Sequence, residues 1–370
     1  MNDILLFKSN IEKTTSLISF YLFCISILLG NNEYVSLMGV FLSLPYLAKI
    51  FKTWIVNKYF VFLLFFLIVG ASVNSIFTSN GFGGILLILG VLSISIFIIQ
   101  NIDYIFLHVK YTLLFILLYY SIIIFIFKKD PNEVYVGMSR NYIGLIVVLF
   151  NVLYSYLYYI KSKKIDLIFC IYSLFLTFFL VGRSSIGLQL FLVLINFFYS
   201  FKNRRILMFF ILFIMLLIGY CYFRDDIELL YRASSFGGYG MDSPRYVIWK
   251  DFFDSASYYD YVFGLDSKLL LVARKYSGNL HNEFLNLVAR TGVGAIALFI
   301  VLCCSCFKLI YNRNFYLFSL CMISSARIFF DTGVFLNNLG IAYYSILLYP
   351  LYKNFKSFTY ESTNSNVDYE

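Results

Sequence analysis

The sequence predicts an all-α fold, a polytopic transmembrane helical bundle of about 12 spans with one long extracytoplasmic loop before the last three helices. Hydrophobic residues make up 61% of the 370 positions and charged residues only 13%, and the mean hydropathy is +0.81. Soluble domains carry about 25% charged residues, so this chain lacks the residues for a water-exposed surface. Repeated apolar runs of about 17–22 residues match the ~30 Å of hydrocarbon that a helix must cross, and the short alternating strands of a transmembrane barrel are missing.

The apolar runs and the connections between them divide the chain into four parts. We expect an N-terminal transmembrane bundle of about nine spans over 1–223, an extracytoplasmic loop with short amphipathic helices over 224–284, three C-terminal spans over 285–352, and a cytoplasmic tail over 353–370. The first apolar run lacks an evident cleavage site and is expected to remain as an anchor. The predicted spans are 14–30, 33–50, 58–77, 82–100, 110–127, 141–160, 166–182, 184–201, 206–223, 285–307, 315–331 and 333–352.

Basic residues in the connections predict the orientation of the chain. Lysines gather in alternate connections, and loops rich in Lys and Arg stay in the cytoplasm. We therefore expect a multi-pass protein of the cytoplasmic (inner) membrane with both termini in the cytoplasm. The residues that define this face are Lys8, Lys13, Lys49, Lys52, Lys58, Lys110, Lys161, Lys163, Lys164, Lys202, Arg204, Arg205, Lys308, Arg313, Lys353 and Lys356.

Most arginines of the chain are on the opposite face. Topology needs only positive charge, but a guanidinium also presents a planar fork of donors that binds phosphate oxygens in pairs. Arginines on the translocated face therefore indicate an anionic, phosphate-bearing ligand there. They are Arg140, Arg183, Arg224, Arg232, Arg245, Arg274 and Arg290, with Arg327 near this face in the eleventh predicted span.

Several other functions are disfavoured by the sequence. The net charge of +9 follows the topology and does not form a nucleic-acid surface. The seven cysteines lie in or at the edge of apolar runs, and the cluster Cys303, Cys304 and Cys306 has no His or carboxylate beside it, so no zinc site is expected. The pair Asp225 and Asp226 is the only weak metal candidate, and we predict neither a metal nor a cofactor.

The densest group of chemically capable residues lies in the long loop. Pro244 suits the first position of a helix, and Arg245, Tyr246 and Trp249 follow it. Arg245 and Trp249 are one turn apart and share a helix face. These residues are expected either to bind a ligand or to anchor an interfacial helix.

His281 and Asn282 stand where the loop meets the next span. Histidine titrates near neutrality and suits proton transfer from a hydroxyl, whereas the competing interpretation makes His281 or Asn282 a helix cap. Arg290 lies two to three turns further on, and Arg183 lies in the break between two spans; arginines at such positions are functional candidates. For Arg327 and Asp331, ligand binding and a structural ion pair are both open.

The order of these motifs resembles the O-antigen polymerase and O-antigen ligase superfamily. The resemblance rests on Arg245-x-x-x-Trp249, Gly264 and His281-Asn282, followed by a helix with Arg290, Gly292 and Gly294; Gly182-Arg183-Ser184-Ser185 resembles the Ser/Gly-Arg motif of an earlier helix in that superfamily. It covers about spans 5 to 12, with the long loop before the last few spans. The motifs do not separate the polymerase branch from the ligase branch.

The resemblance implies an inverting, metal-independent glycosyltransferase. A glycan on undecaprenyl diphosphate would pass to a sugar hydroxyl of another lipid-linked repeat unit, building the O-antigen of lipopolysaccharide or a capsule. His281, Arg290, Arg183 and Arg245 are the expected catalytic residues; Trp249, Asn282, Tyr246, Arg140, Arg274 and Arg327 are the expected substrate-binding residues. The implied partners are undecaprenyl-diphosphate-linked oligosaccharide and membrane lipid. A chain-length regulator protein is a further candidate partner.

Three alternatives stay open. An O-antigen ligase would use lipid A core as the acceptor. A polysaccharide or lipid flippase would show two-fold internal similarity and short loops, whereas this chain has one long loop. A glycosyltransferase that uses lipid monophosphate sugars would carry acidic residues in a large first outer loop, whereas here that loop is only about 30–33.

Overall fold

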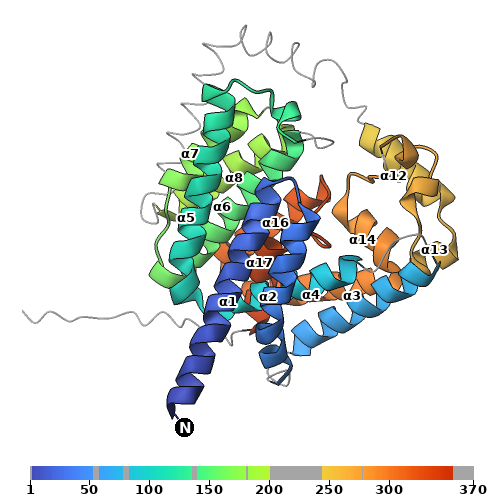
Figure 1. The fold of residues 1–370 in the computed structure, drawn as a ribbon. Coiled ribbons are helices and arrows are strands. Elements are labelled where there is room, and N and C mark those ends of the chain that lie inside the picture. Colours follow the sequence, from blue (N-terminus) through green and yellow to red (C-terminus); the bar gives the residue numbers. More distant parts are fainter. Residues whose placement is uncertain are drawn as a thin grey trace, which may run out of the picture.

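The computed structural model describes residues 2–52, 58–77, 83–135, 140–180, 182–200, 244–276 and 278–352. Within these ranges the regular elements are helices and none is a strand, which confirms the all-α prediction (Figure 1). The helices of the first half are α1 (Asn2–Leu28), α2 (Glu33–Lys52), α3 (Lys58–Phe77), α4 (Gly83–Gln100), α5 (Ile102–Ser121), α6 (Arg140–Ser162), α7 (Ile168–Phe179) and α8 (Arg183–Ser200). Those of the second half are α12 (Pro244–Ser255), α13 (Tyr258–Phe263), α14 (Glu283–Thr291), α15 (Ala295–Tyr311), α16 (Phe315–Phe329) and α17 (Gly340–Tyr352).

Four helical segments are long and apolar enough to cross a membrane, namely Asn10–Leu28, Ile102–Ile126, Asn141–Ser162 and Glu283–Tyr311. Shorter apolar helices of 10–17 residues accompany them in the described ranges. The chain is thus a helical membrane protein. The total of about 12 spans, the kind of membrane and the cytoplasmic position of the termini stay predictions.

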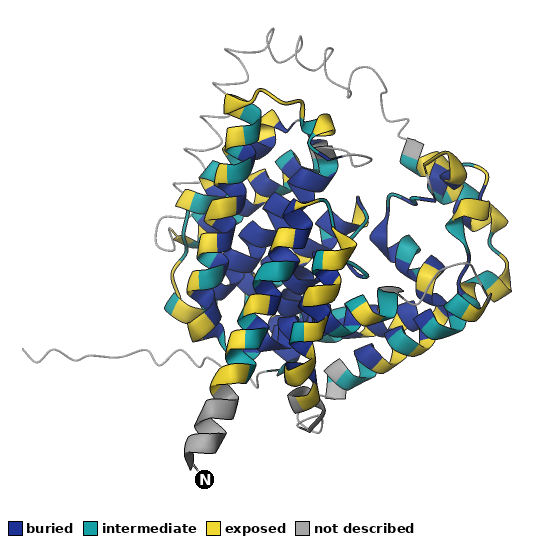
Figure 2. Ribbon diagram, in the orientation of Figure 1, coloured by how far each residue is buried: buried dark blue, intermediate teal, exposed yellow. Residues whose placement is uncertain are grey.

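Polar side chains of the bundle helices are buried and large apolar ones are exposed, as expected for helices surrounded by lipid. Asn151, Gln189 and Asn196 have no exposed surface, whereas Phe115 and Phe178 are more than half exposed. Polar groups within a bilayer face the bundle interior because lipid offers them no hydrogen-bond partner. Figure 2 shows buried residues gathered in the middle of the bundle and exposed ones on its outer helix faces.

Helix α17 is the centre of the bundle. Every residue from Gly340 to Leu351 is buried, and the helix packs against α4, α6 and α15. Helices α1 and α2 pack against each other, and α5 and α7 flank α6 (Figure 1). The core is therefore built around the last described helix of the chain.

Four predicted spans differ in extent from the observed helices. The span predicted at 14–30 belongs to α1, which begins at Asn2. The span predicted at 285–307 starts at Glu283 and is interrupted by a 3-10 turn, η6 (Gly292–Gly294), between α14 and α15. The span predicted at 333–352 becomes helical only at Gly340, because the preceding loop donates its backbone N–H groups to a side chain elsewhere. The span predicted at 110–127 starts at Ile102 and ends in a π-helical turn, η2 (Ile122–Ile126). The predicted span 206–223, the loop residues 224–243 and the tail 353–370 lie outside the described residues.

The described part of the long loop folds into short helices with clear local signals. Pro244 is the first residue of α12, as its fixed φ favours. Ser257 and Asp260 form a reciprocal capping box at α13. Two 3-10 turns follow, η4 (Ser267–Leu269) and η5 (Ala273–Tyr276). Their apolar side chains form a small separate core with α14: Ile248, Phe252, Leu265, Leu270, Ala273, Leu280 and Ala289.

Glycines allow close packing between α3 and the described part of the long loop, residues 244–276 and 278–282, which we call the loop unit. Gly264 (φ 83°) and Gly292 (φ 52°) both adopt backbone conformations that disfavour a side chain. A Cβ on Gly292 would collide with the Val262 carbonyl, and one on Gly294 would lie 2.6 Å from the Phe66 carbonyl oxygen. Asn74 of α3 completes the junction, since its Nδ2 donates to the carbonyls of Phe263 and Ala289, each at 3.1 Å.

We expect Gly292→Ala to lower the thermal stability of the protein by several degrees. Alanine at positive φ costs about 1–2 kcal/mol, and the collision with the Val262 carbonyl adds to this cost. Melting in detergent, followed by fluorescence, measures the change. Gly187→Ala is the matched control, because a Cβ there meets no atom within 4 Å and alanine favours the helix α8. Equal melting temperatures for the two variants would contradict the close packing.

Candidate functional site

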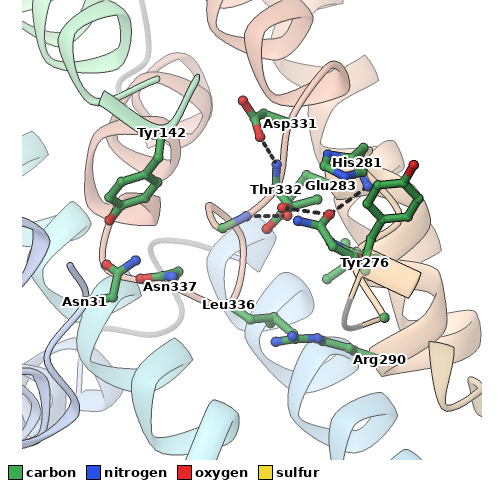
Figure 3. Close-up of a pocket in the computed structure, with 15 residues that line it drawn as sticks. Asn31, Tyr142, Tyr276, His281, Glu283, Arg290, Asp331, Thr332, Leu336 and Asn337 are labelled. Carbon is green, nitrogen blue, oxygen red and sulfur yellow. Dashed lines mark hydrogen bonds between the residues drawn. The ribbon is translucent and has the colours of Figure 1, made fainter. Parts of the chain in front are cut away.

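A pocket of about 540 Å³ lies between the bundle and the end of the loop unit (Figure 3). Its walls come from the α1–α2 turn and the start of α6, from residues 276–290, and from the loop between α16 and α17. The lining residues are Asn31, Tyr142, Tyr276, Gly278, Asn279, His281, Glu283, Asn286, Leu287, Arg290, Asp331, Thr332, Gly333, Leu336 and Asn337. The volume falls within the range of about 300–1,000 Å³ typical of small-molecule sites. Of the ten predicted site residues, His281 and Arg290 line this pocket.

His281 is held in an unusual backbone conformation. Its φ is 50°, in the left-handed region that few residues other than Gly, Asn, Asp and His adopt. Its N–H donates to Asn279 Oδ1 at 2.8 Å, and its ring lies edge-on to Tyr276 with centroids 5.6 Å apart. Residues held in such strained conformations cluster at functional sites, because the surrounding structure must maintain them.

The surroundings of His281 favour its neutral form. Burial lowers the pKa of the imidazole below its usual value, the nearby positive charge of Arg245 lowers it further, and Asp331 opposes them. Near neutral pH the ring is therefore uncharged and able to accept a proton. Such a group in a polar pocket suits general base catalysis.

Glu283 joins two walls of the pocket. Its carboxylate accepts backbone N–H bonds from Gly333 at 2.7 Å, Val334 at 2.8 Å and Phe335 at 2.6 Å. The side chain is 4% exposed, so these donors replace the water that a carboxylate needs. The amide cradle around Glu283, meaning the N–H groups of 333–335, thus fixes the loop after α16 to the start of α14.

A second link runs parallel to the cradle. Thr332 Oγ1 donates to Asn279 Oδ1 at 3.1 Å. Asn279 Oδ1 also accepts the hydrogen bond from the His281 N–H. Asp331, beside Thr332, faces the pocket. The two links keep Asp331, His281 and the helix that carries Arg290 in one arrangement.

Arg327 supports Asp331 from behind. It is fully buried, its Nη1 and Nη2 both donate to Asp331 Oδ2 at 3.2 Å, and Nη2 also donates to the Asn141 carbonyl at 2.7 Å. Arg327 does not line the pocket, and its guanidinium forms an ion pair with Asp331. A buried arginine must be paired in this way because an isolated charge there is costly.

Arg290 provides the positive charge of the pocket floor. It is exposed near the end of α14 and lies below His281 and Glu283 in Figure 3. Glu283 and Arg290 are two turns apart on one helix and face the same cavity. A flexible guanidinium that is open to the cavity can reach an anionic group of a ligand.

Two predicted site residues of α12 lie behind the pocket. Arg245 is half-buried, and its charge acts on both His281 and Arg327. Trp249 donates from Nε1 to the Leu280 carbonyl at 2.9 Å, and its ring packs edge-on to Phe329 with centroids 5.5 Å apart. Trp249 therefore supports the turn that carries His281 and does not present a face to the pocket.

The remaining predicted residues are not brought into the pocket. Asn282 is the N-cap of α14, since its Oδ1 accepts from the N–H groups of Phe284 and Leu285, as the capping interpretation proposed. Tyr246 is 69% exposed, and Arg274 is exposed on η5 away from the lining. Arg140 and Arg183 are the first residues of α6 and α8, but their side chains lie outside the described parts of the chain.

Sequence reasoning missed Asn31, Tyr142, Asn279, Glu283 and Thr332. A Gly-Asn pair directly after an apolar run is typical of a left-handed helix end, and this signal could have drawn attention to Asn31. Nothing in the sequence pairs Glu283 with a loop 50 residues later.

Among the described residues no group of three or more His, Cys, Asp and Glu side chains is placed to hold a metal ion. Asp225 and Asp226 lie outside the described residues. No protein-family model, no curated protein and no solved structure matches the chain. Functional conclusions therefore depend on the pocket itself.

Proposed function

We propose that the protein is a polymerase of a bacterial surface polysaccharide, O-antigen or capsule. It joins undecaprenyl-diphosphate-linked oligosaccharide repeat units on the outer face of the cytoplasmic membrane. The proposal depends on one observation: His281 and Arg290 line the same pocket of a membrane protein. The surroundings of His281 favour its neutral form, and the Arg290 side chain is exposed. The motif order Arg245, Trp249, Gly264, His281 and Asn282 supports the same class.

The reaction needs one base and one anion stabiliser. The hydroxyl oxygen of the acceptor sugar attacks the anomeric carbon of the donor, and the bond from that carbon to the diphosphate breaks. The electron pair leaves with the diphosphate, whose charge Arg290 stabilises. The hydroxyl proton passes to the imidazole of His281, which burial and Arg245 keep neutral. A single displacement of this kind inverts the anomeric centre.

The remaining pocket residues suit a carbohydrate. Asn31, Asn279, Asn286 and Asn337 bring carboxamides to the lining, and each carboxamide can donate and accept hydrogen bonds. Sugar hydroxyls do the same. Asp331, backed by Arg327, adds a fixed acceptor beside His281.

Reconstitution tests the proposal directly. Purified protein in lipid vesicles receives lipid-linked repeat units from cells that lack the gene, and products are separated on a gel. A ladder of increasing chain length is expected. Transfer of a single glycan to lipid A core, with no ladder, would identify a ligase, and movement of the lipid without any new glycosidic bond would identify a flippase.

The rate of transfer should fall as the pH falls through the pKa of His281, because protonation removes the base. That pKa lies below the usual value of about 6.5. Arg245→Gln removes a charge that lowers it, so the acid limb of the profile should move to higher pH. Rates from pH 5 to 8 measure this shift. Lys250→Gln, an exposed change on the same helix, is the control and should leave the limb in place; an unmoved limb in Arg245→Gln would remove His281 as the titrating group.

A further inference from the structure

The segment that joins η4 to η5 exposes two leucines on the surface of the loop unit. Leu269 is 80% exposed and Leu271 is 75% exposed, whereas Leu270 between them is buried in the small core. Single exposed apolar residues are common on protein surfaces, but two neighbouring leucines that both stand out this far form an apolar protrusion. We call residues 268–275, which contain this protrusion, the leucine tip.

Backbone hydrogen bonds hold the leucine tip in this shape. Leu270 is extended, with φ −69° and ψ 135°, and successive side chains of an extended backbone point to opposite sides. Because Leu270 points into the core, its two neighbours point outward. The Val272 N–H donates to Asp251 Oδ2 at 2.8 Å, and Ser267 Oγ donates to the Gly278 carbonyl at 2.6 Å. The exposure of the two leucines is therefore part of the fold.

Basic residues stand on both sides of the two leucines. Lys268 precedes them, Arg274 and Lys275 follow them, and all three side chains are exposed. The sequence of the leucine tip contains neither Asp nor Glu, so its charge is positive throughout. An apolar protrusion between basic side chains suits an anionic bilayer surface. The apolar groups enter the boundary between headgroups and acyl chains, while long basic side chains keep their charges among the headgroups.

The loop unit lies where lipid can reach it. Figure 1 shows α12 and α13 at the side of the bundle, next to the end of α3, and Figure 2 shows exposed residues along the outer rim of the loop unit. Helix α3 is apolar, and its outward side chains are exposed as lipid-facing ones are, with Phe65 at 59% and Ile76 at 73%. Ile76 lies in the last turn of α3, where Asn74 donates to the Phe263 carbonyl of α13. The lipid-facing side of α3 therefore leads to the loop unit.

We propose that the leucine tip docks on the bilayer that holds the bundle. Leu269 and Leu271 insert between lipid headgroups, and the three basic side chains bind the phosphates of anionic lipids. The tip is joined directly to the pocket, since Tyr276, the last residue of η5, lines it and packs against the ring of His281 with centroids 5.6 Å apart. Docking thus holds one wall of the pocket near the headgroups, whichever reaction the pocket carries out.

Introduced tryptophans test the docking in the full-length protein. Leu269→Trp and Leu271→Trp each place an apolar fluorophore at an exposed position of the tip. Each protein is reconstituted in vesicles of phosphatidylcholine and phosphatidylglycerol, and the emission added to that of the two native tryptophans is measured. Two quenchers are compared, acrylamide in the water and lipid brominated on its acyl chains. We expect brominated lipid to remove most of the added emission and acrylamide to remove little.

Glu133→Trp is the matched control. Glu133 is exposed on the short polar turn η3 (Pro131–Glu133), which has no exposed leucine. A tryptophan there should lose its emission to acrylamide and keep it with brominated lipid. Equal quenching by brominated lipid at Glu133→Trp and at the tip would mean that the tryptophan itself enters the bilayer, which would overturn the proposal.

The basic residues are tested in the Leu269→Trp protein. Changing Lys268, Arg274 and Lys275 together to glutamine should reduce the quenching by brominated lipid. High salt or vesicles of phosphatidylcholine alone should do the same without any substitution, because both weaken the attraction to anionic lipid. Quenching that none of these changes reduces would overturn the contacts with lipid phosphates.

Two further outcomes would overturn the docking itself. Quenching of both tip tryptophans by acrylamide alone, as at Glu133→Trp, would show that the tip is in water. Tryptophans shielded from acrylamide and from brominated lipid would show that protein covers the tip, which in purified vesicles means a second copy of the chain. Melting temperatures close to wild type verify that the variants are folded.

Discussion

His281→Ala should abolish long-chain polysaccharide while single lipid-linked repeat units persist. Without the imidazole, the acceptor hydroxyl has no base in the pocket, and loss of a general base slows a reaction by about 10²- to 10⁴-fold. At that rate chains of many units do not form. Gel ladders of extracted polysaccharide, together with the initial transfer rate of the purified protein, measure the effect.

The second histidine of the chain is the matched control. His108 lies on α5, where its Nδ1 meets the Tyr21 hydroxyl at 2.7 Å, and it does not line the pocket. His108→Ala should therefore give a normal ladder. A normal ladder from His281→Ala as well would remove His281 from the mechanism. The left-handed backbone at 281 calls for a second variant, and His281→Asn suits it because asparagine tolerates this conformation.

Arg290→Ala should reduce the transfer rate by about 10²- to 10³-fold, the size of effect seen when one donor to a developing anion is removed. Arg290→Lys should recover part of this loss, because lysine keeps the charge but lacks the planar fork that binds two phosphate oxygens. Arg290 is exposed at the pocket, so neither change disturbs the packed core, and both variants should melt close to wild type. Equal rates for wild type and Arg290→Ala would show that the leaving group is stabilised elsewhere.

The helical nature of the fold could be predicted because it depends on local signals. Apolar runs of membrane-spanning length predict helices whatever surrounds them, and Pro244 marks the start of α12 as expected. The capping interpretation of Asn282 and the ion-pair interpretation of Arg327 with Asp331 also came from short-range spacing. In each of these features the interacting residues are at most two helical turns apart in the sequence.

The errors concern features that depend on distant contacts. The interruption at Gly292–Gly294 falls inside an apolar run, and it exists because the Val262 carbonyl and α3 approach the backbone there. Hydropathy does not report such an approach. The late start of α17 has the same kind of cause, since the loop before it donates its N–H groups to Glu283.

The site was foreseen only in part for a similar reason. His281 and Arg290 stood out because titratable and charged residues are conspicuous in an apolar sequence. Asn31 and Tyr142 are ordinary residues near helix ends, and they gain significance only because α1, α2 and α6 meet around one cavity. Trp249 and Asn282 stood out equally well, yet Trp249 supports the turn at 281 through the Leu280 carbonyl, and Asn282 caps α14.

The amide cradle around Glu283 has a consequence for how the protein is made. A ribosome produces Glu283 fifty residues before Gly333, so for that interval the carboxylate has no amides to receive it and must stay hydrated or neutral. The pocket can close only after the segment preceding α17 has emerged and folded back. A chain that ended between these two points would carry Glu283 without its amide donors and would lack one wall of the pocket.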